Sequence, residues 1–211
     1  TAWSSWGSAI KKTLRAAEQD RPDLQAARAH WRQQQPQWPA TRLVFIDETG
    51  LNTKMTRLYG RSQRGNRCMC AEPHGHWQSA TFIAALRSDR LCAPLLLDGP
   101  MDGTMFLAYL HEVLAPELLE GDIVICDNLS SHKVAGVTDA IAARGAQLHY
   151  LPAYSPDLNP IEMAFSKLKA HLRQAARRTW TGLIRATASA LDTFTTAHCL
   201  NFLRHAQYAT E

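Results

Sequence analysis

The stretch Leu43-Val44-Phe45-Ile46-Asp47-Glu48-Thr49-Gly50 places a short apolar run directly before two carboxylates. An apolar run of this length, bounded by turn-forming residues, is typical of a buried strand. A second apolar run, Ile123-Val124-Ile125-Cys126, ends at Asp127 in the same way. We therefore expect Asp47 and Asp127 at the last positions of two buried strands, at the sheet edge where open α/β folds bind ligands.

The rest of the chain alternates strand and helix patterns around these two runs. The apolar spacing predicts further strands over 77–86, 93–97 and 147–151, and helices over 103–114, 135–144 and from 161 onward. This order predicts an α/β fold with a mixed central sheet flanked by helices. Residues 1–40 are expected to form a helical linker segment that ends in Gln- and Pro-rich sequence, and residues 41–211 to form one domain.

The composition is that of a folded chain without a membrane span. Hydrophobic residues make up 45% of the 211 residues, which is too many for a disordered chain. No stretch approaches about 18 consecutive apolar residues. The five cysteines are scattered and odd in number, which favours a reducing compartment over a disulfide framework. We therefore expect a cytoplasmic protein.

The charge is distributed unevenly along the chain. The net charge of +4 conceals three basic segments, residues 1–40, 51–76 and 163–178, which together carry +12, so that the remainder carries −8. Phosphate binding needs local positive charge, and metal-dependent phosphate chemistry needs clustered carboxylates. Basic segments beside an acidic body therefore favour a nucleic-acid partner.

The two carboxylates that follow apolar runs indicate a metal site. Burial of an unpaired carboxylate is costly, and a divalent cation such as Mg²⁺ or Mn²⁺ offsets that cost. A third candidate ligand, Glu162, follows a loop made rigid by Pro152, Pro156 and Pro160. Local structure offers an alternative to metal binding for each of these carboxylates. Each Asp could cap the next turn, and Asn159 has capping-box spacing to Glu162 at the start of a helix.

Three segments together resemble a known family. They are Phe45-Ile46-Asp47-Glu48-Thr49-Gly50, Cys126-Asp127-Asn128-Leu129-Ser130-Ser131-His132-Lys133 and Tyr154-Ser155-Pro156-Asp157-Leu158-Asn159-Pro160-Ile161-Glu162. They closely resemble the three motifs of DDE transposases of the mariner superfamily, in particular its bacterial insertion-sequence branch. The spacing agrees, because 34 residues lie between Asp127 and Glu162. The resemblance covers roughly residues 41–205, and residues 11–22 resemble the family's linker into its catalytic domain.

The resemblance implies a ribonuclease H-like fold in which Asp47, Asp127 and Glu162 are catalytic and bind two Mg²⁺ (or Mn²⁺) ions. The implied activity is phosphodiester hydrolysis at transposon ends, followed by strand transfer into target DNA. The implied partners are double-stranded DNA and a second copy of the chain, as a homodimer in the synaptic complex. Family members carry paired helix-turn-helix modules before the linker, and we expect this chain to lack them.

Two other functions remain open. One is a ribonuclease H-like nuclease that cuts without joining, and the other is a non-catalytic or truncated DNA-binding remnant of a transposase. For each of them, as for the transposase, we expect a bacterial cytoplasmic location, at the nucleoid during activity.

Residues near the three motifs are candidates for supporting roles. Asn128 and His132 are predicted to contact the metal ligands or the water around the ions, with a turn-forming or solvent-facing role as the alternative. Basic side chains are predicted to hold DNA phosphates, or else to form a solvated surface. These are Arg57, Arg61, Arg64, Arg67, Lys133, Lys167, Lys169 and Arg173.

One further pattern has the residue types of a zinc site. Cys68-x-Cys70 is followed by His74-x-His76, but the spacing is too cramped for the usual paired ligand loops. This favours two small buried residues in a strand, followed by a loop.

Overall fold

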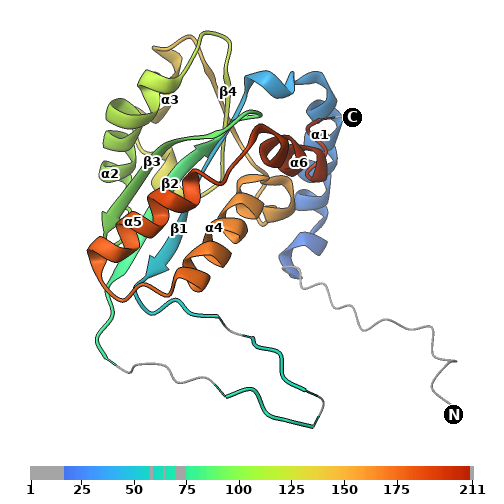
Figure 1. Ribbon diagram of the computed structural model, residues 1–211. Helices are drawn as coiled ribbons and strands as arrows, with labels where there is room; N and C mark the ends of the chain where they lie inside the picture. The colour runs from blue at the N-terminus through green and yellow to red at the C-terminus, as the bar shows by residue number, and fades with distance from the viewer. Residues whose placement is uncertain (1–16, 58, 64, 70–74, 210–211) are drawn as a thin grey trace, which may run out of the picture.

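The computed structural model describes residues 17–57, 59–63, 65–69 and 75–209, and its centre is a five-stranded sheet (Figure 1). The strands β1 and β2 pair antiparallel, as do β2 and β3, whereas β1 and β4, and β4 and β5, pair parallel. The sheet order is β3-β2-β1-β4-β5, with β1 (Leu43–Asn52), β2 (Ser79–Leu86), β3 (Leu91–Asp98), β4 (Ile123–Cys126) and β5 (Gln147–Tyr150).

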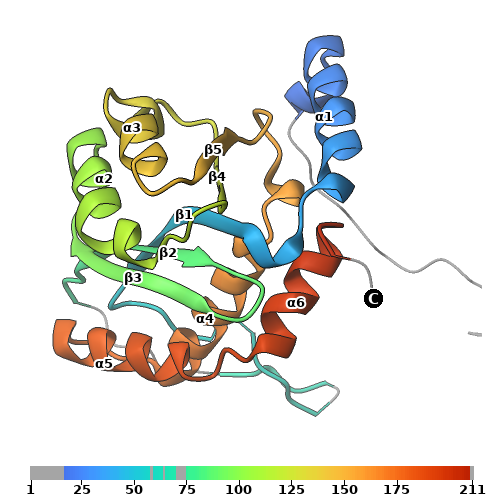
Figure 2. The same cartoon turned by 90° about the horizontal axis from the view of Figure 1, so that it is seen from above.

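Helices cover both faces of the sheet (Figure 2). One face packs against α2 (Gly103–Tyr109), its continuation Leu110–Leu114, and α3 (Val137–Ala142). The other packs against α1 (Pro22–Gln34), α4 (Ile161–Ala175), α5 (Trp180–Leu191) and α6 (Thr196–His205). The predicted α/β fold with a mixed, helix-flanked sheet is confirmed. None of the helices in the described part of the chain is long and apolar enough to cross a lipid bilayer.

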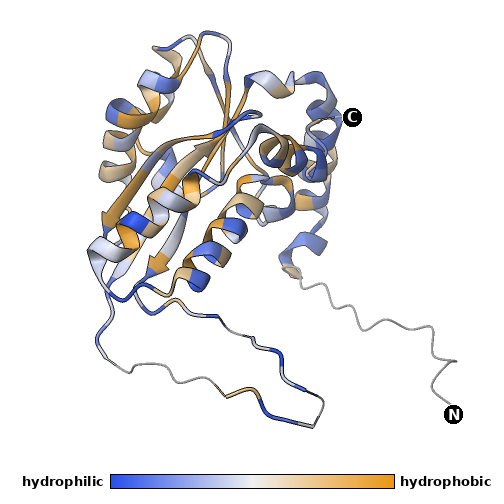
Figure 3. Ribbon diagram, viewed as in Figure 1, coloured by the Kyte–Doolittle hydropathy of each residue, from blue (hydrophilic) through white to orange (hydrophobic). Residues whose placement is uncertain are grey.

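The strand β1 is buried on both faces, which explains its apolar run. Leu43 and Phe45 pack with the helices of the α4 face, whereas Val44 and Ile46 pack with those of the α2 face. All four side chains are fully buried. Figure 3 shows the same arrangement, with hydrophobic strands inside and many hydrophilic residues on the helices outside. A strand covered on both sides needs continuous apolar sequence in place of alternation.

The position of Asp47 within β1 differs from the prediction. Pairing with the parallel strand β4 ends at Ile46, but antiparallel pairing with β2 continues to Asn52. Asp47 therefore lies inside β1, one residue past the point where β4 stops, and its prediction as the last strand residue was wrong. Thr49-Gly50 forms no turn because β2 supplies backbone partners there. Asp127 directly follows β4, one residue past the last strand position that was predicted for it.

The N-terminal helix α1 is packed onto the domain. Trp31 is 6% exposed and belongs to the same core as α4 and α6. Its Nε1 donates a hydrogen bond to the hydroxyl of Tyr208 at 2.8 Å, and its ring meets Trp38 edge-on. α1 lies within residues 1–40, for which helical structure was predicted. Residues 1–16 of that segment lie outside the described residues.

Replacement of Trp31 by Ala should destabilise the folded protein by about 3–5 kcal/mol, because it empties a buried indole site and removes the partner of Tyr208. Urea unfolding followed by circular dichroism measures this change. The control is Leu119→Ala, since Leu119 is 61% exposed and its loss should cost less than about 0.5 kcal/mol. Similar effects of the two substitutions would contradict the packing of α1 onto the core.

Candidate active site

Asp47 is a buried carboxylate on the α4 face of the sheet. Only 7% of the residue is exposed. Its Oδ1 accepts a hydrogen bond from the backbone N–H of Glu48 at 2.8 Å, and its Oδ2 accepts one from Nδ2 of Asn159 at 2.8 Å. Because successive side chains of a strand alternate between faces, Asp47 shares the face of Phe45. The central strand thus holds this carboxylate rigidly.

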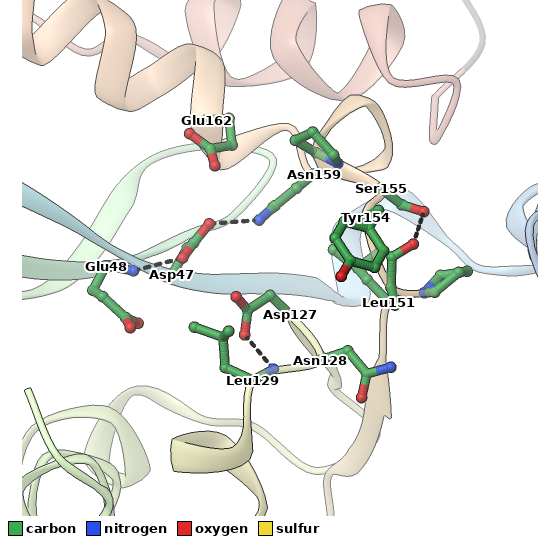
Figure 4. A pocket seen from close by; sticks show the side chains of 13 residues that line it. Asp47, Glu48, Asp127, Asn128, Leu129, Leu151, Tyr154, Ser155, Asn159 and Glu162 are labelled. Carbon is green, nitrogen blue, oxygen red and sulfur yellow. Dashed lines mark hydrogen bonds between the residues drawn. The ribbon is translucent and has the colours of Figure 1, made fainter. Parts of the chain in front are cut away.

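Asp47, Asp127 and Glu162 line one cavity of about 540 Å³. Asp127 comes from the turn after β4, and Glu162 from the first turn of α4. Figure 4 shows Asp127 and Glu162 on either side of Asp47. The structure therefore brings together the three carboxylates that the sequence singles out. The other lining residues are Glu48, Asn128, Leu129, Leu151, Pro152, Ala153, Tyr154, Ser155, Pro156 and Asn159.

Burial and like charges raise the pKa of Asp47 to about 8. Burial contributes most, followed by the negative charges of Glu162 and Asp127, and the hydrogen bond from the Glu48 N–H offsets only part of this. Desolvation also raises the pKa of Glu162. The positive charge of Lys169 opposes this shift, and the negative charge of Asp127 adds to it. A bound cation would reverse these shifts, because it stabilises the charged form of each carboxylate.

Asn159 holds Asp47 and does not cap α4. The N-cap position of α4 is Pro160, and no side chain caps the helix, so the capping-box alternative was wrong. The Asn159 side chain instead donates to Asp47, while its own Oδ1 is buried without a hydrogen-bond partner in the described part of the chain. Buried polar atoms are rarely left unpaired. A free acceptor oxygen beside a buried carboxylate therefore fits a bound cation or its water.

His132 links the second carboxylate to Glu48. The ring is fully buried, its Nδ1 lies 2.5 Å from Oδ1 of Asp127, and its Nε2 lies 2.9 Å from Oε2 of Glu48. Burial alone would lower the pKa of His132, but the hydrogen bonds and charges of the two carboxylates raise it to about 9. Both ring nitrogens then donate at neutral pH. An imidazolium thus bridges Asp127 and Glu48 and orients Asp127.

Glu48 and Asn159 are site residues that the sequence analysis missed. Strand alternation turns Glu48 to the opposite face from Asp47, and Figure 4 shows it leaving β1 in a different direction. This alternation could have indicated Glu48 from the sequence, because it places two adjacent carboxylates on opposite faces of the sheet, where each needs its own partner. Asn159 gave no such signal, because its local sequence is equally typical of a helix cap.

The loop before Glu162 is held by α1 and by Tyr208, which follows α6. Nη1 of Arg28 donates to Oγ of Ser155 at 2.7 Å and to Oδ1 of Asp157 at 2.9 Å, and Nη2 donates to Oδ2 of Asp157 at 2.6 Å. The hydroxyl of Tyr208 donates to the carbonyl oxygen of Leu158 at 2.8 Å. α1 and the residues that follow α6 therefore fix the loop that positions Asn159 and Glu162.

The basic residues predicted on α4 have different surroundings. Lys169 and Arg173 line a groove between α4 and the end of β1. Lys167 points elsewhere, because its Nζ donates to the carbonyl oxygen of Thr193 at 2.7 Å and lies over the ring of Phe194. The structure thus places Lys167 at the junction between α5 and α6, and not at the cavity.

The remaining predicted residues are mostly on the surface. Asn128 is exposed and lines the cavity, and Lys133 is exposed with its Nζ 5.3 Å from the ring centroid of Tyr150. The loop between β1 and β2 carries the predicted arginines. Arg57, Arg61 and Arg67 are exposed there, and Arg64 lies outside the described residues.

No three His, Cys, Asp or Glu side chains in the described ranges are arranged to hold one metal ion together. The cavity carboxylates therefore surround a common space without converging on a single point. At the possible zinc pattern, Cys68 is an exposed free thiol, so its prediction as a buried residue was wrong. Cys70 and His74 of that pattern lie outside the described residues.

A family model described as DDE superfamily endonuclease matches residues 42–181, a range that includes all three carboxylates. The chain belongs to this family. The sequence of this DDE endonuclease matches none of the curated proteins with which it was compared.

Several solved structures are similar to this DDE endonuclease over nearly its whole length. The Mos1 mariner paired-end complex with Mn has a TM-score of 0.77 at 14% identity, covering 95% of this chain and 64% of that one. The Mos1 paired-end complex with the left transposon end has a TM-score of 0.76 at 16% identity, with the same coverage. The catalytic domain of Mos1 mariner transposase has a TM-score of 0.63 at 13% identity, covering 94% and 92%.

At such low identity the similarity shows the fold, and it confirms the predicted ribonuclease H-like fold. This DDE endonuclease chain spans 64% of the length of the transposase chain in the paired-end complexes.

The stability of the metal-free protein should fall as the pH rises from about 6.5 to 8. The pKa of Asp47 is about 8 in the folded protein, against roughly 3.9 in an unfolded chain, so the folded state binds the extra proton throughout this window. A group whose pKa is raised in this way lowers the free energy of unfolding by up to about 1.4 kcal/mol for each unit of pH rise. His132, with its pKa raised to about 9, acts in the same direction.

Urea unfolding in EDTA at several pH values measures this dependence. Asp47→Asn should remove the part that Asp47 contributes and leave the part from His132, so the variant should gain stability relative to the wild type as the pH rises. Asp139→Asn, an exposed acid on α3, serves as the control. Parallel pH profiles for Asp47→Asn and the wild type would contradict the assigned environment of Asp47.

Loss of the Arg28 side chain should loosen the loop before Glu162. The backbone N–H groups of Leu158 and Asn159 donate to Ser155 and Pro156, and Arg28→Ala should speed their hydrogen exchange about tenfold, equivalent to ~1.4 kcal/mol. Arg28→Lys should restore little of this protection, because an ammonium cannot make the forked contact. Arg21→Ala removes an exposed pair with Asp23 and should leave the loop unchanged. Equal hydrogen-exchange rates at Leu158 and Asn159 in all variants would show that Arg28 does not hold this loop.

Proposed function

We propose that this chain is the catalytic domain of a transposase of the mariner superfamily, from its bacterial insertion-sequence branch. It would cleave DNA at transposon ends and transfer the freed strand into target DNA. The observation that carries this proposal is the placement of Asp47, Asp127 and Glu162 around one cavity, within the range that matches the DDE endonuclease family. The three motifs that resemble that superfamily supply these three residues.

The donor types in the cavity suit two Mg²⁺ or Mn²⁺ ions, which Asp47, Asp127 and Glu162 would hold. The fit rests on carboxylates that repel each other and on the unpaired Oδ1 of Asn159. Two such ions, when bound, activate the attacking oxygen and stabilise the leaving oxygen of an in-line displacement. The Mos1 complexes that contain Mn or Mg support this choice of ion for a similar fold.

The residues around the three carboxylates would prepare them for this role. Asp47 must lose its proton as it becomes a ligand, and the amide of Asn159 keeps its Oδ2 in place. The His132 imidazolium holds Oδ1 of Asp127 and leaves the other oxygen of that carboxylate for a ligand. Glu48 supports His132 from the opposite face of the sheet. None of these steps needs a covalent bond between protein and DNA.

The proposed partner is double-stranded DNA, in a synaptic complex that contains a homodimer. The exposed Arg57, Arg61, Arg67 and Lys133 would contact phosphates near the cavity, together with Lys169 and Arg173. These contacts would position the backbone and would carry little sequence information. The similar Mos1 chains are part of transposase–DNA complexes, which supports this choice of partner. The proposed site of action is the nucleoid in the bacterial cytoplasm.

Incubation of the protein with Mn²⁺ and pre-cleaved end DNA of its own element should yield joined product. Asp47→Asn, Asp127→Asn and Glu162→Gln should each reduce joining to background, because each removes a ligand. His132→Asn should cost about 10- to 100-fold, as expected for a residue that orients a ligand. The exposed Asp139→Asn is the control.

The products separate the proposal from its alternatives. Nicking of generic DNA without joining would favour a nuclease, and salt-sensitive DNA binding without cleavage under any metal would favour a non-catalytic remnant. Wild-type activity in Asp47→Asn would exclude the carboxylate assignment.

A further inference from the structure

The strand β1 and the helix α4 lie side by side (Figure 1). Each contributes a carboxylate to the cavity, Asp47 from β1 and Glu162 from the first turn of α4. Beyond Ile46, β1 is paired only with β2 among the described strands, because pairing with β4 ends there. The strand then continues from Asp47 to Asn52 with one edge free of strand partners. Gly50 within this stretch is exposed, and a side chain added there would meet open space. An open channel lies between the end of β1 and α4.

A groove of about 460 Å³ occupies this channel. It is lined from one side by the end of β1 and the residues that follow, and from the other by α4. Its lining contains three cations and no acidic residue. The lining residues are Gly50, Asn52, Lys54, Met55, Thr56, Trp77, Lys169 and Arg173.

The cations of α4 lie on the same helical face as Glu162. Lys169 and Arg173 follow Glu162 by 7 and 11 residues, which at 100° per residue places each within about 20° of it. No Asp or Glu occurs from residue 163 to residue 191, whereas six Lys and Arg residues do. The acidic cavity therefore passes directly into a surface of positive potential along α4.

The opposite wall of the groove adds a cation and an aromatic ring. Nζ of Lys54 lies 4.7 Å from the ring centroid of Trp77, and Trp77 is 55% exposed. The guanidinium of Arg178 donates to the carbonyl oxygen of Thr53, which ties the segment between α4 and α5 to this wall. The groove thus has cations on both sides and an exposed aromatic ring in one wall. This combination suits a sugar–phosphate backbone.

The length of α4 sets the distance from the carboxylates to the groove. Eleven residues of helix from Glu162 to Arg173 span about 16 Å, and five residues of strand from Asp47 to Asn52 span a similar ~16 Å. Successive phosphates of a DNA strand are spaced by about 3.4 Å along the duplex axis. The groove is therefore about five base pairs from the carboxylates.

We propose that this groove binds backbone phosphates of duplex DNA about five base pairs from the bond on which the carboxylates act. The inference rests on the proposed function for the identity of that bond, and it adds Asn52, Lys54 and Trp77 to the DNA-contacting surface. The groove holds the duplex by charge and shape. It therefore sets the position of the DNA and not the sequence that is cut.

Fluorescence anisotropy of a labelled duplex across a range of salt concentrations tests the groove without requiring catalysis. Lys54→Ala, Lys169→Ala and Arg173→Ala should each lower the slope of log affinity against log salt by about 0.9, the value of one phosphate contact. Arg204→Ala, an exposed cation on α6, is the matched control.

Neutral methylphosphonate linkages locate the contact along the DNA. Neutralisation of phosphates about four to six base pairs from the reactive end should erase the difference between wild type and Arg173→Ala, whereas neutralisation at about twelve base pairs should preserve it. Circular dichroism confirms that each variant is folded. Wild-type slopes in all three cation variants, or an effect independent of the neutralised position, would overturn the proposal.

The outcomes keep this inference apart from the proposed function. If the wild type joins DNA and the groove variants have unchanged salt slopes, the groove proposal is excluded and the transposase proposal stands. If the groove variants have reduced salt slopes and the effect maps to the expected phosphates, but the protein neither cuts nor joins DNA, the groove stands as a DNA contact and the catalytic proposal is excluded.

Discussion

Mutual repulsion between three carboxylates in one cavity is the constraint on which the rest of this domain depends. Asp47 cannot move away from Asp127 and Glu162, because it belongs to the central strand of a sheet covered on both faces. The surrounding residues reduce this repulsion without removing it. Asn159 and a backbone N–H donate to Asp47, and a buried imidazolium neutralises Asp127 from the other face. The remaining charge favours the uptake of a divalent cation.

The sequence predicts the framework of the site well, for a physical reason. Strands buried on both faces require continuous apolar runs, so the segments 43–46 and 123–126 stand out, and the carboxylates after them are easily noticed. Glu162 was found through its motif and the rigid loop before it. The end of β1 was misplaced, because the pairing with β2 that extends it depends on a strand about 30 residues later.

The contacts that support the site are harder to predict, because they join distant parts of the chain. Glu48 meets His132 across 84 residues, and Arg28 meets Asp157 across 129. No local pattern marks either pair. Asn159 is a different case, since its local pattern fits a helix cap equally well, and only the nearby carboxylate of Asp47 explains why its side chain turns inward. Local sequence thus shows which groups could act, and the folded chain shows which partners hold them.

The contacts that hold the loop before Glu162 extend the functional unit beyond the region of sequence similarity. The family match covers residues 42–181, yet Arg28, Trp31 and Tyr208 all lie outside it and together hold that loop. A fragment trimmed to the matching range would keep every proposed ligand but lose the braces that orient one of them. The structural unit that positions Glu162 is therefore wider than the region of sequence similarity. Loss of the contacts that Arg28 makes from α1 would therefore free the loop that carries Asn159 and leads into Glu162.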